Sequence, residues 1–513
     1  MLNEKNKVLI LDFGGQYSQL IARRVREQNV YCEIKPYDIS PEEITDFNPQ
    51  GIILSGGPAS VYKENAPDCQ DIIFSGKWPV LGICYGMQLM VHKLEGKVQR
   101  ADSREYGVME MEIKDEKSKL LHGISSPTKV LMSHSDYIPY APSDFKVTAI
   151  SKNTPTAVIE NDEKQLYGIQ FHPEVIHSEC GREVIKNFLF KIAKIDADWT
   201  MDSFIETTVD NISSQIKDKK AVCGLSGGVD SAVAALLVHK AIGENLTCIF
   251  VDHGLLRHNE AEEVMEAFEG KLGLKVIKVD AKEHFLSKLE GVTDPERKRK
   301  IIGNEFIHIF EKEAAKYGQG EFLVQGTLYP DIVESGTKTA TTIKTHHNVG
   351  GLPEDMFFTL CEPLKELFKD EVREVGKKLG LAEHLVNRQP FPGPGMAIRV
   401  MGEVNDEKLS LLRKADAIVR EEIKAYDKEN KVWQYFAVLP GSYSVGVMGD
   451  DRTYQQVVAV RAVGSEDGMT ASWSHLPYEV LDRISQRIVN EVDGVNRVVY
   501  DITSKPPGTI EWE

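Results

Sequence analysis

One segment, at residues 221–243, constrains the fold more than any other part of the sequence. Five largely apolar residues indicate a buried parallel strand, SGGVDS at 226–231 indicates a tight turn, and the residues from Ala232 onward have helical spacing. A glycine-rich turn between a strand and a helix N-terminus presents backbone N–H groups and the positive end of a helix dipole. The segment therefore predicts a strand–turn–helix unit with an anion site at the turn.

The turn differs from the loop that serves γ-phosphate transfer, because no lysine follows its glycines. Asp230 stands there instead, and a carboxylate beside phosphates would repel them. We therefore expect Asp230 to act through Mg²⁺, which prefers one or two carboxylates together with phosphate oxygens. A bare SGG would indicate only an ordinary turn, but the full motif resembles the pyrophosphate loop of enzymes that split ATP into AMP and pyrophosphate. This resemblance implies ATP binding by Ser226, Gly227, Gly228, Val229, Asp230 and Ser231.

Length and composition restrict the class of protein. A chain of 513 residues is too long for one core, and chains of this length form about three domains. The net charge of −17 argues against a general binder of nucleic acid or anionic membranes. No apolar run approaches the roughly 18 residues of a membrane span. Seven cysteines, few and odd in number, predict reduced thiols in a cytoplasmic protein.

Changes in the pattern of apolar, polar and turn-forming residues along the chain predict three domains. Short apolar strands alternate with turns and helices over residues 1–194, and a second such stretch follows over 195–387. The segment 387–395 holds three prolines and two glycines, which no helix or central strand can cross. Residues 388–513 mix helical and strand-like runs. The predicted fold class is thus two consecutive α/β domains with mainly parallel sheets, followed by a smaller α+β domain.

A second chemical motif surrounds Cys84, which ends an apolar strand and has glycines two residues before and after it. This frame resembles a nucleophile elbow, in which glycines allow a strained turn. A helix beginning near Tyr85 would favour the thiolate. Another strand ends at His172, which can take the thiol proton, and Glu174 can fix the tautomer of that histidine. A lone cysteine usually packs inertly, but these partners favour a nucleophile.

The turn SGGP at 55–58 completes the predicted thiol site. The N–H group of Gly57 in this turn, together with that of Tyr85, can hold a tetrahedral oxyanion. Together the pieces resemble the class I glutamine amidotransferase family. The resemblance implies that Cys84, His172 and Glu174 hydrolyse glutamine to glutamate and ammonia. None of the other six cysteines has glycines both two residues before and two residues after it. The sequence contains no C-x-x-C pair, so a zinc site with thiolate ligands is not expected.

Three further positions are candidates for the ATP site. Val251 lies in the next strand, where it can pack against adenine or simply in the core, and Gly326 ends another strand. Both are expected at the same sheet edge. Lys369 can supply the cation that the turn lacks, although a helical lysine is usually solvated. The basic run 297–300 indicates either a solvated helix surface or an arginine clamp for the phosphate of a second substrate.

An ammonia-releasing domain joined to an AMP-forming domain implies that ATP adenylates a carbonyl oxygen, which ammonia then displaces as AMP. The whole chain resembles the glutamine-hydrolysing GMP synthetase family. Beyond the two sites, the resemblance rests on YPDIVES at 329–335, IKTHHN at 343–348, FPGPG at 391–395, GVMGD at 446–450 and KPPGTIEWE at 505–513.

This resemblance implies substrates, site residues and assembly. XMP is the implied acceptor, adenylated on its C2 oxygen and aminated to GMP, and the C-terminal domain is implied to form a homodimer. The residues implied to bind XMP are Arg299, Lys505, Ile510 and Glu511. The residues implied to form a lid over ATP are Asp331, Glu334, Lys344, His346 and His347.

Two other interpretations stay open. One is another ATP-pyrophosphatase amidating enzyme with a different acceptor, such as an NAD or asparagine synthetase. Asparagine synthetases of the N-terminal nucleophile type need a cysteine after the initiator methionine, and this chain has Leu2. The other is a scaffold that kept both folds, which predicts the loss of Cys84 or Asp230, and both are present.

Overall fold

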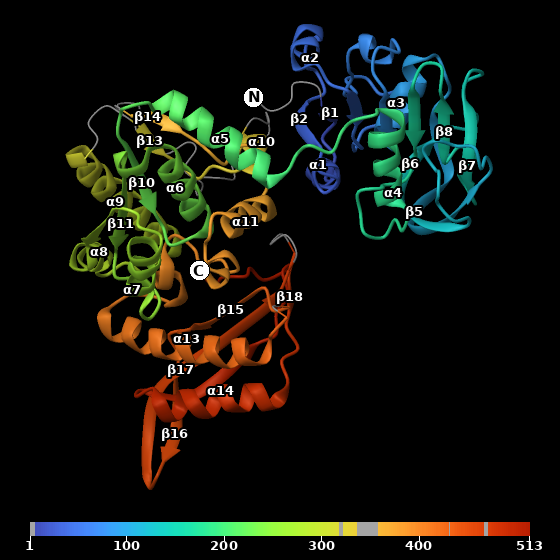
Figure 1. Cartoon of the computed structure of the whole chain (residues 1–513). Helices are drawn as coiled ribbons and strands as arrows, with labels where there is room; N and C mark the ends of the chain where they lie inside the picture. Colours follow the sequence, from blue (N-terminus) through green and yellow to red (C-terminus); the bar gives the residue numbers. More distant parts are fainter. Residues whose placement is uncertain (1–5, 318–321, 336–357, 430, 466–469) are drawn as a thin grey trace. The chain divides into compact units, whose positions relative to one another are not determined.

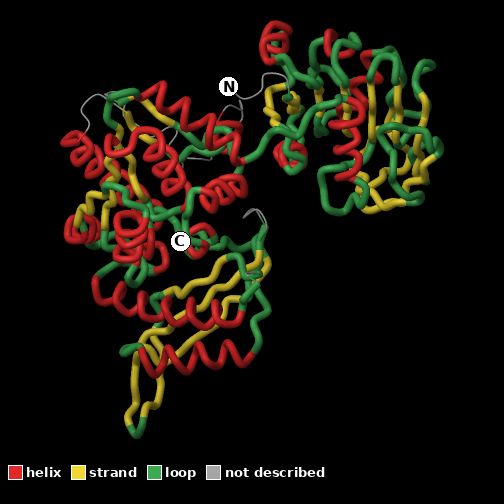
Figure 2. The backbone as a smooth tube through the Cα atoms, in the orientation of Figure 1, coloured by secondary structure: helices red, strands yellow, loops and turns green. Residues whose placement is uncertain are grey.

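The structure is a computed structural model that describes residues 6–317, 322–335, 358–429, 431–465 and 470–513. The chain divides into two compact units. The first comprises Met1–Thr207 with Leu328–Leu352, and the second comprises Thr208–Thr327 with Pro353–Glu513. Figures 1 and 2 show the elements of each unit.

The first unit is built on a nine-stranded sheet in the order β2-β1-β3-β4-β9-β8-β7-β5-β6. Neighbouring strands from β2 to β9 are parallel, and those from β9 to β6 are antiparallel. The strands are β1 (Lys7–Asp12), β2 (Tyr31–Pro36), β3 (Gly51–Leu54), β4 (Val80–Ile83), β5 (Gln99–Ile113), β6 (Thr128–Tyr137), β7 (Lys146–Ser151), β8 (Val158–Asn161) and β9 (Leu166–Ile169). The parallel part was predicted, whereas the antiparallel extension from β5 to β8 was not.

The central strands of this sheet are buried along their whole length, because β3, β4 and β9 are continuous apolar runs. Their carboxyl ends form one edge, from which the site residues project. The helical elements of the unit are α1 (Ser18–Arg26), α2 (Pro41–Phe47), η1 (Asp71–Phe74), α3 (Tyr85–Lys93), α4 (Gly181–Asn187), η2 (Phe188–Ile192) and α10 (Tyr329–Ser335), and α5 (Met201–Ile216) runs from this unit into the second.

The second unit contains a five-stranded parallel sheet in the order β12-β11-β10-β13-β14. Its strands are β10 (Ala221–Leu225), β11 (Leu246–Asp252), β12 (Val276–Asp280), β13 (Phe322–Val324) and β14 (Thr359–Cys361). Strands β10, β11 and β13 were predicted, whereas β14 was not. Its helical elements are α6 (Val229–Ile242), η3 (Gly243–Asn245), α7 (Glu260–Met265), η4 (Glu266–Lys271), α8 (Lys282–Leu289), α9 (Pro295–Tyr317), α11 (Lys369–Lys378) and α12 (Glu383–Val386).

The same unit carries a second sheet, around the long strand β17, which pairs with β15, β16 and β18 antiparallel and with β19 parallel. Helix α13 packs on β15, α14 packs on β19, and the two helices contact each other (Figure 1). This is the predicted α+β region. Its elements are η5 (Gly395–Arg399), α13 (Asp406–Tyr426), β15 (Gln434–Val438), β16 (Tyr443–Met448), β17 (Asp451–Gly464), β18 (Ser472–Trp473), α14 (Tyr478–Glu491) and β19 (Val495–Asp501).

Over the described ranges, the helices are all too short or too polar to span a bilayer.

Candidate active sites

Cys84 lies at a tight turn between β4 and α3. Its backbone has φ 51° and ψ −103°, a conformation that side-chain-bearing residues rarely adopt. Two glycines make room for the turn: a Cβ on Gly82 would lie 2.7 Å from Met87 N, and one on Gly86 would lie 2.5 Å from Leu54 O. The structure therefore confirms the predicted elbow and the steric role of both glycines.

His172 and Glu174 follow β9, which runs parallel beside β4, so both residues reach the sheet edge where Cys84 lies. His172 Nδ1 is 2.7 Å from Glu174 Oε1, and both side chains are buried. Burial alone would lower the pKa of His172, but hydrogen bonds with Cys84 and Glu174 outweigh it and raise the pKa to about 10. This environment favours an imidazolium beside the sulfur at neutral pH.

The turn at 55–58 packs directly against this pair. A Cβ on Gly56 would lie 3.1 Å from His172 Cε1 and 3.8 Å from Cys84 Cβ. A Cβ on Gly57 would lie 2.9 Å from Phe13 O and 3.3 Å from the Cγ of Tyr85. The structure thus brings the predicted oxyanion residues, Gly57 and Tyr85, together beside the nucleophile.

Two polar groups of this site were not predicted from the sequence. Gln170 Nε2 lies 3.5 Å from Cys84 Sγ, and Arg24 Nε donates to the Glu174 carbonyl oxygen over 3.0 Å. Gln170 is fully buried. The sequence did contain an indication of Gln170, because a single glutamine inside the apolar run 166–171 must find a hydrogen-bond partner in the core.

In the second unit, the turn 226–231 is tied together by its own serines. Ser226 N donates to Ser231 Oγ over 3.2 Å, and Gly228 N donates to Ser226 Oγ over 3.3 Å. Gly227 has φ +74°, which favours glycine. Helix α6 begins at Val229 rather than at the expected Ala232, because extended Gly228 is its N-cap. The loop therefore ends at a helix N-terminus, as predicted.

The residues predicted to accompany this turn gather around Asp230. A Cβ on Gly326 would lie 3.4 Å from Asp230 Cβ, so the chain after β13 contacts the start of α6. Lys369, the first residue of α11, forms an ion pair with Asp230 through Nζ and Oδ2. Val251 is buried near the carboxyl end of β11, at the edge where the turn lies.

Asp230 also has the free acceptor that a cation needs. Its Oδ1 atom is buried and has no hydrogen-bond partner, although Oδ2 pairs with Lys369. Within the described part of the chain, no three His, Cys, Asp or Glu side chains form a metal site of protein ligands alone. Mg²⁺ needs only one or two carboxylates when phosphates supply the other oxygens. The donor set around Asp230 therefore fits Mg²⁺ bound together with a nucleotide.

Arg388 is a further residue of this site that the sequence did not reveal. Its Nη1 donates to the Gly227 carbonyl oxygen over 2.8 Å, and its Nη2 pairs with Glu260 Oε1. The guanidinium is therefore fixed from two sides while it supports the glycine turn. No local pattern around Arg388 distinguishes it from a solvated arginine.

Glu511, one of the predicted XMP residues, is held by a buried arginine. Arg399 is fully buried and donates to Glu511 through Nε over 3.0 Å and Nη2 over 2.8 Å. Gln434 Nε2 donates to the same carboxylate over 2.8 Å. Arg399 was missed, although an arginine inside the apolar run 396–400 indicates a buried charge pair.

The basic run 297–300 is not uniformly solvated. Lys298 is fully buried and donates to the carbonyl oxygens of Val400, over 2.7 Å, and Ala397, over 3.3 Å, and it pairs with the Glu513 side chain. Arg299 donates to the Glu513 main-chain oxygen. The structure therefore joins helix α9, including predicted Arg299, to the C-terminal segment.

The C-terminal segment itself is docked on the sheet around β17. Ile510 is 9% exposed and packs in a core cluster, and Trp512 Nε1 donates to Asp501 Oδ2 over 3.0 Å. Lys505 exchanges two backbone hydrogen bonds with Ala471. Predicted Ile510 and Lys505 are thus fixed to the sheet around β17.

Most of the predicted lid lies outside the described residues, namely Lys344, His346 and His347. Asp331 lies in α10, where its Oδ2 accepts from Leu328 N over 3.1 Å. Glu334 lies in the same helix, and its side chain is not described.

Comparison with protein families supports this division of chemistry. Residues 9–192 match the class-I glutamine amidotransferase family, residues 200–308 match the NAD synthase family, and residues 421–512 match the GMP synthase C-terminal domain. The first two matches contain Cys84 and Asp230, respectively.

Curated relatives match the whole chain. A protein of Caldanaerobacter subterraneus named GMP synthase [glutamine-hydrolyzing] is 61% identical over 510 residues, 99% of each chain. Proteins of the same name from Carboxydothermus hydrogenoformans and Clostridium novyi are 60% identical, covering 99% and 100% of this chain and all of their own. The chain therefore belongs to the glutamine-hydrolysing GMP synthase family.

Proposed function

We propose that this protein makes GMP from XMP. Glutamine is hydrolysed to glutamate and ammonia, ATP adenylates the C2 oxygen of XMP with release of pyrophosphate, and ammonia displaces AMP. The observation that carries the proposal is a complete thiol triad and a complete pyrophosphate turn in one chain that is 61% identical to a GMP synthase over 99% of its length.

In the glutaminase step, the Cys84 proton passes to His172 and the thiolate attacks the side-chain amide carbon of glutamine. The Gly57 and Tyr85 N–H groups stabilise the oxyanion, and His172 gives its proton to the departing ammonia. Water, deprotonated by His172, then hydrolyses the thioester and regenerates Cys84. Glu174, 2.7 Å from His172, holds the imidazole in the required orientation throughout.

In the ATP site, the turn 226–231 binds the pyrophosphate through its backbone N–H groups and the N-terminus of α6. Mg²⁺, when bound through Asp230, neutralises phosphate charge and orients the leaving pyrophosphate. Lys369 supplies a second positive charge at the same carboxylate. Gly326 allows the nucleotide close to the backbone, and Val251 forms an apolar wall for adenine. The lid residues Asp331, Glu334, Lys344, His346 and His347 exclude water from the adenylate.

We assign XMP to Arg299, Lys505, Ile510 and Glu511. The Arg299 guanidinium can donate two parallel hydrogen bonds to the phosphate, and Lys505 adds a second positive charge. Support comes from the contact between α9 and the C-terminal segment, and from the buried Arg399 that fixes Glu511. A carboxylate held in this way accepts from base N–H groups without rearranging.

The test is to incubate the protein with Mg²⁺, ATP and XMP, with either glutamine or ammonium, and to quantify all products. Equal amounts of GMP, AMP and pyrophosphate with both nitrogen donors are expected. A Cys84→Ala variant should lose only the glutamine-driven reaction. ADP and phosphate would contradict the pyrophosphate turn, and AMP formed only with another acceptor would contradict the XMP assignment.

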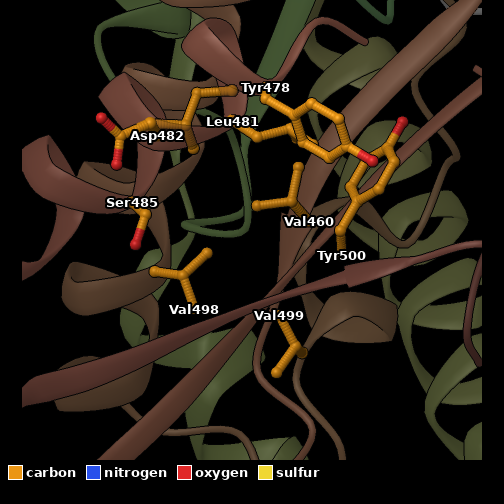
Figure 3. Close-up of a pocket in the computed structure, with 9 residues that line it drawn as sticks. Val460, Tyr478, Leu481, Asp482, Ser485, Val498, Val499 and Tyr500 are labelled. Carbon is orange, nitrogen blue, oxygen red and sulfur yellow. The ribbon is translucent and has the colours of Figure 1, made fainter. Parts of the chain in front are cut away.

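We also propose a cytoplasmic homodimer that pairs through residues 388–513. Tyr478 on α14 is 88% exposed and borders a hollow of about 380 Å³ with Val499 and Tyr500 (Figure 3). Apolar side chains also protrude from the β16–β17 hairpin, where Val447 is 76% exposed and Tyr454 is 70% exposed. Burying such side chains against a second copy is favourable. Light scattering at micromolar concentration should give twice the chain mass of 57.5 kDa, and a monomer would contradict the dimer.

A further inference from the structure

A chain of buried amides leads from strand β6 to the sulfur of Cys84. It consists of Gln88 on α3, Gln170 directly after β9, and the main-chain carbonyl of Asp136 on β6. Gln88 is 3% exposed and Gln170 is 0% exposed. Water therefore has no access to these amides, and each hydrogen bond in the chain matters to their orientation.

The distances define a continuous path. Gln88 Nε2 lies 2.9 Å from Asp136 O and 3.3 Å from Gln170 Oε1. Gln170 Nε2 lies 3.5 Å from Cys84 Sγ, a normal length for a hydrogen bond to sulfur. The residues that carry this path are separate from the His172–Glu174 pair, which approaches the same sulfur.

The orientation of both amides follows from one fixed group. A backbone carbonyl only accepts, so the Gln88 atom facing Asp136 O must be the NH₂ group. The same NH₂ group faces Gln170, which must therefore present its oxygen to Gln88. The other end of the Gln170 amide, facing Cys84, is then the N–H donor. The assignment does not depend on distinguishing nitrogen from oxygen directly.

Gln170 is one uncharged neighbour of the sulfur, and the Ser133 carbonyl oxygen is another. The carbonyl oxygen favours the thiol over the thiolate. Cys84 Sγ lies 3.9 Å from the Ser133 carbonyl oxygen, which can accept from a thiol S–H but repels a thiolate. The N–H of Gln170 favours the thiolate, because hydrogen bonds to an ionised acceptor are about twice as strong as neutral ones. Of these two uncharged neighbours, only Gln170 favours the ionised sulfur once the proton has moved to His172.

We propose that Gln170 is a further catalytic residue of the glutaminase site: its buried amide N–H donates to the Cys84 thiolate, with Gln88 as the residue that positions that amide. The proposal deepens the function proposed above and rests on it only for the identity of the reaction. No proton leaves Gln170, which stabilises the ionised sulfur before attack and again when the thioester breaks.

The experiment measures thiolate formation without relying on any product. The rate of alkylation of Cys84 by iodoacetamide is followed between pH 5 and pH 10 in the full-length protein, and the rate in Cys84→Ala is subtracted as background. The variants are Gln170→Leu, isosteric Gln170→Glu and Gln88→Leu. Gln99→Leu is the matched control, because that amide donates to Tyr137 on the same sheet, away from the sulfur.

Gln170→Leu should move the pH midpoint of alkylation upward by about one unit, which corresponds to an approximately tenfold slower reaction below the midpoint. Gln170→Glu should raise it further, because its carboxylate repels the thiolate. Gln88→Leu should give a smaller rise, and Gln99→Leu none.

An unchanged midpoint in Gln170→Leu or Gln170→Glu would overturn the proposal. A rate that falls equally at every pH would also overturn it, since this would indicate a packing role. Thermal unfolding and ammonia-driven GMP formation check that each variant is folded. If XMP were not the acceptor, GMP would be absent from wild type as well, while the alkylation midpoints would still shift, so the two failures are distinguishable.

Discussion

Replacing Arg461 with methionine should release the C-terminal segment from its sheet. Arg461 lies on β17 and is fully buried. Its guanidinium donates to three main-chain oxygens of the segment, those of Thr503, Thr509 (3.0 Å) and Ile510 (3.4 Å), and pairs with Asp501 Oδ2 at 3.2 Å. Methionine fills similar space but can donate to none of these oxygens.

The magnitude follows from what is left behind. Asp501 loses its charge partner while only 14% of its side chain is exposed, and three carbonyl oxygens lose a charged donor. Breaking a buried pair by removing one partner costs about 3–5 kcal/mol. Even the lower value, applied to local opening of the segment, makes the open state roughly 100-fold more populated.

Hydrogen exchange followed by mass spectrometry measures this opening directly. Peptides covering residues 503–513 should exchange roughly 100-fold faster in Arg461→Met. Arg461→Lys should give an intermediate exchange rate, because lysine keeps the positive charge but lacks the several planar N–H donors of the guanidinium. Arg483→Met is the matched control: its side chain is 51% exposed and pairs with Glu422, so exchange in the segment should not change.

The Arg461→Met variant should affect GMP formation but not the thiol site of the first unit. Because Ile510 and Glu511 lie on the released segment, ammonia-driven GMP formation should fall sharply in Arg461→Met, whereas alkylation of Cys84 should not change. Wild-type exchange rates over residues 503–513 in Arg461→Met would refute the reasoning, because they would show that the guanidinium does not hold the segment.

The other predictions concern the two reaction sites. Cys84→Ala should abolish glutamine-driven GMP formation and leave ammonia-driven formation intact; equal loss of both would contradict separate sites. Asp230→Asn should raise the Mg²⁺ concentration needed for half-maximal pyrophosphate release, and an unchanged requirement would contradict Mg²⁺ binding there. Gly86→Ala should destabilise the protein by about 1–3 kcal/mol in denaturant titration and slow Cys84 alkylation, because its Cβ would lie 2.5 Å from Leu54 O. His172 has a pKa raised to about 10, so its protonated form contributes stability fully below about pH 6.5, the pKa in the unfolded chain, and this is lost as pH rises through about 10. The difference in thermal midpoint between wild type and His172→Gln should therefore shrink over that pH range.

Much of both sites could be predicted because their chemistry lies in short contiguous motifs. The elbow at Cys84 needs glycines at fixed positions, and the turn 226–231 carries its own serine and glycine requirements. Such local constraints are visible in sequence. The strands before each motif were equally visible, because β4 and β10 are almost wholly apolar.

What escaped prediction depends on contacts between distant segments. Arg399 meets Glu511, and Arg461 meets Thr503, across separations that no local pattern encodes. Strand β6 alternates buried and less buried residues, but its buried face includes the polar side chains of Thr128, His134 and Asp136. It therefore lacks the continuous apolar run that marks the parallel strands. The start of α6 was misplaced by three residues, since the first turn of a helix shows no apolar periodicity of its own.

The position of β9 in the first sheet also governs the order of events during synthesis. This strand lies between β4 and β8, yet it follows both in the chain. A nascent chain that stops before Leu166 already contains Cys84 but lacks the strand that joins the two parts of the sheet, as well as the histidine that follows it. Chains emerge from the ribosome N-terminus first. Glutamine therefore cannot be consumed by a chain that ends before His172, and the triad is complete only shortly before β10, the first strand of the second unit, begins to be made.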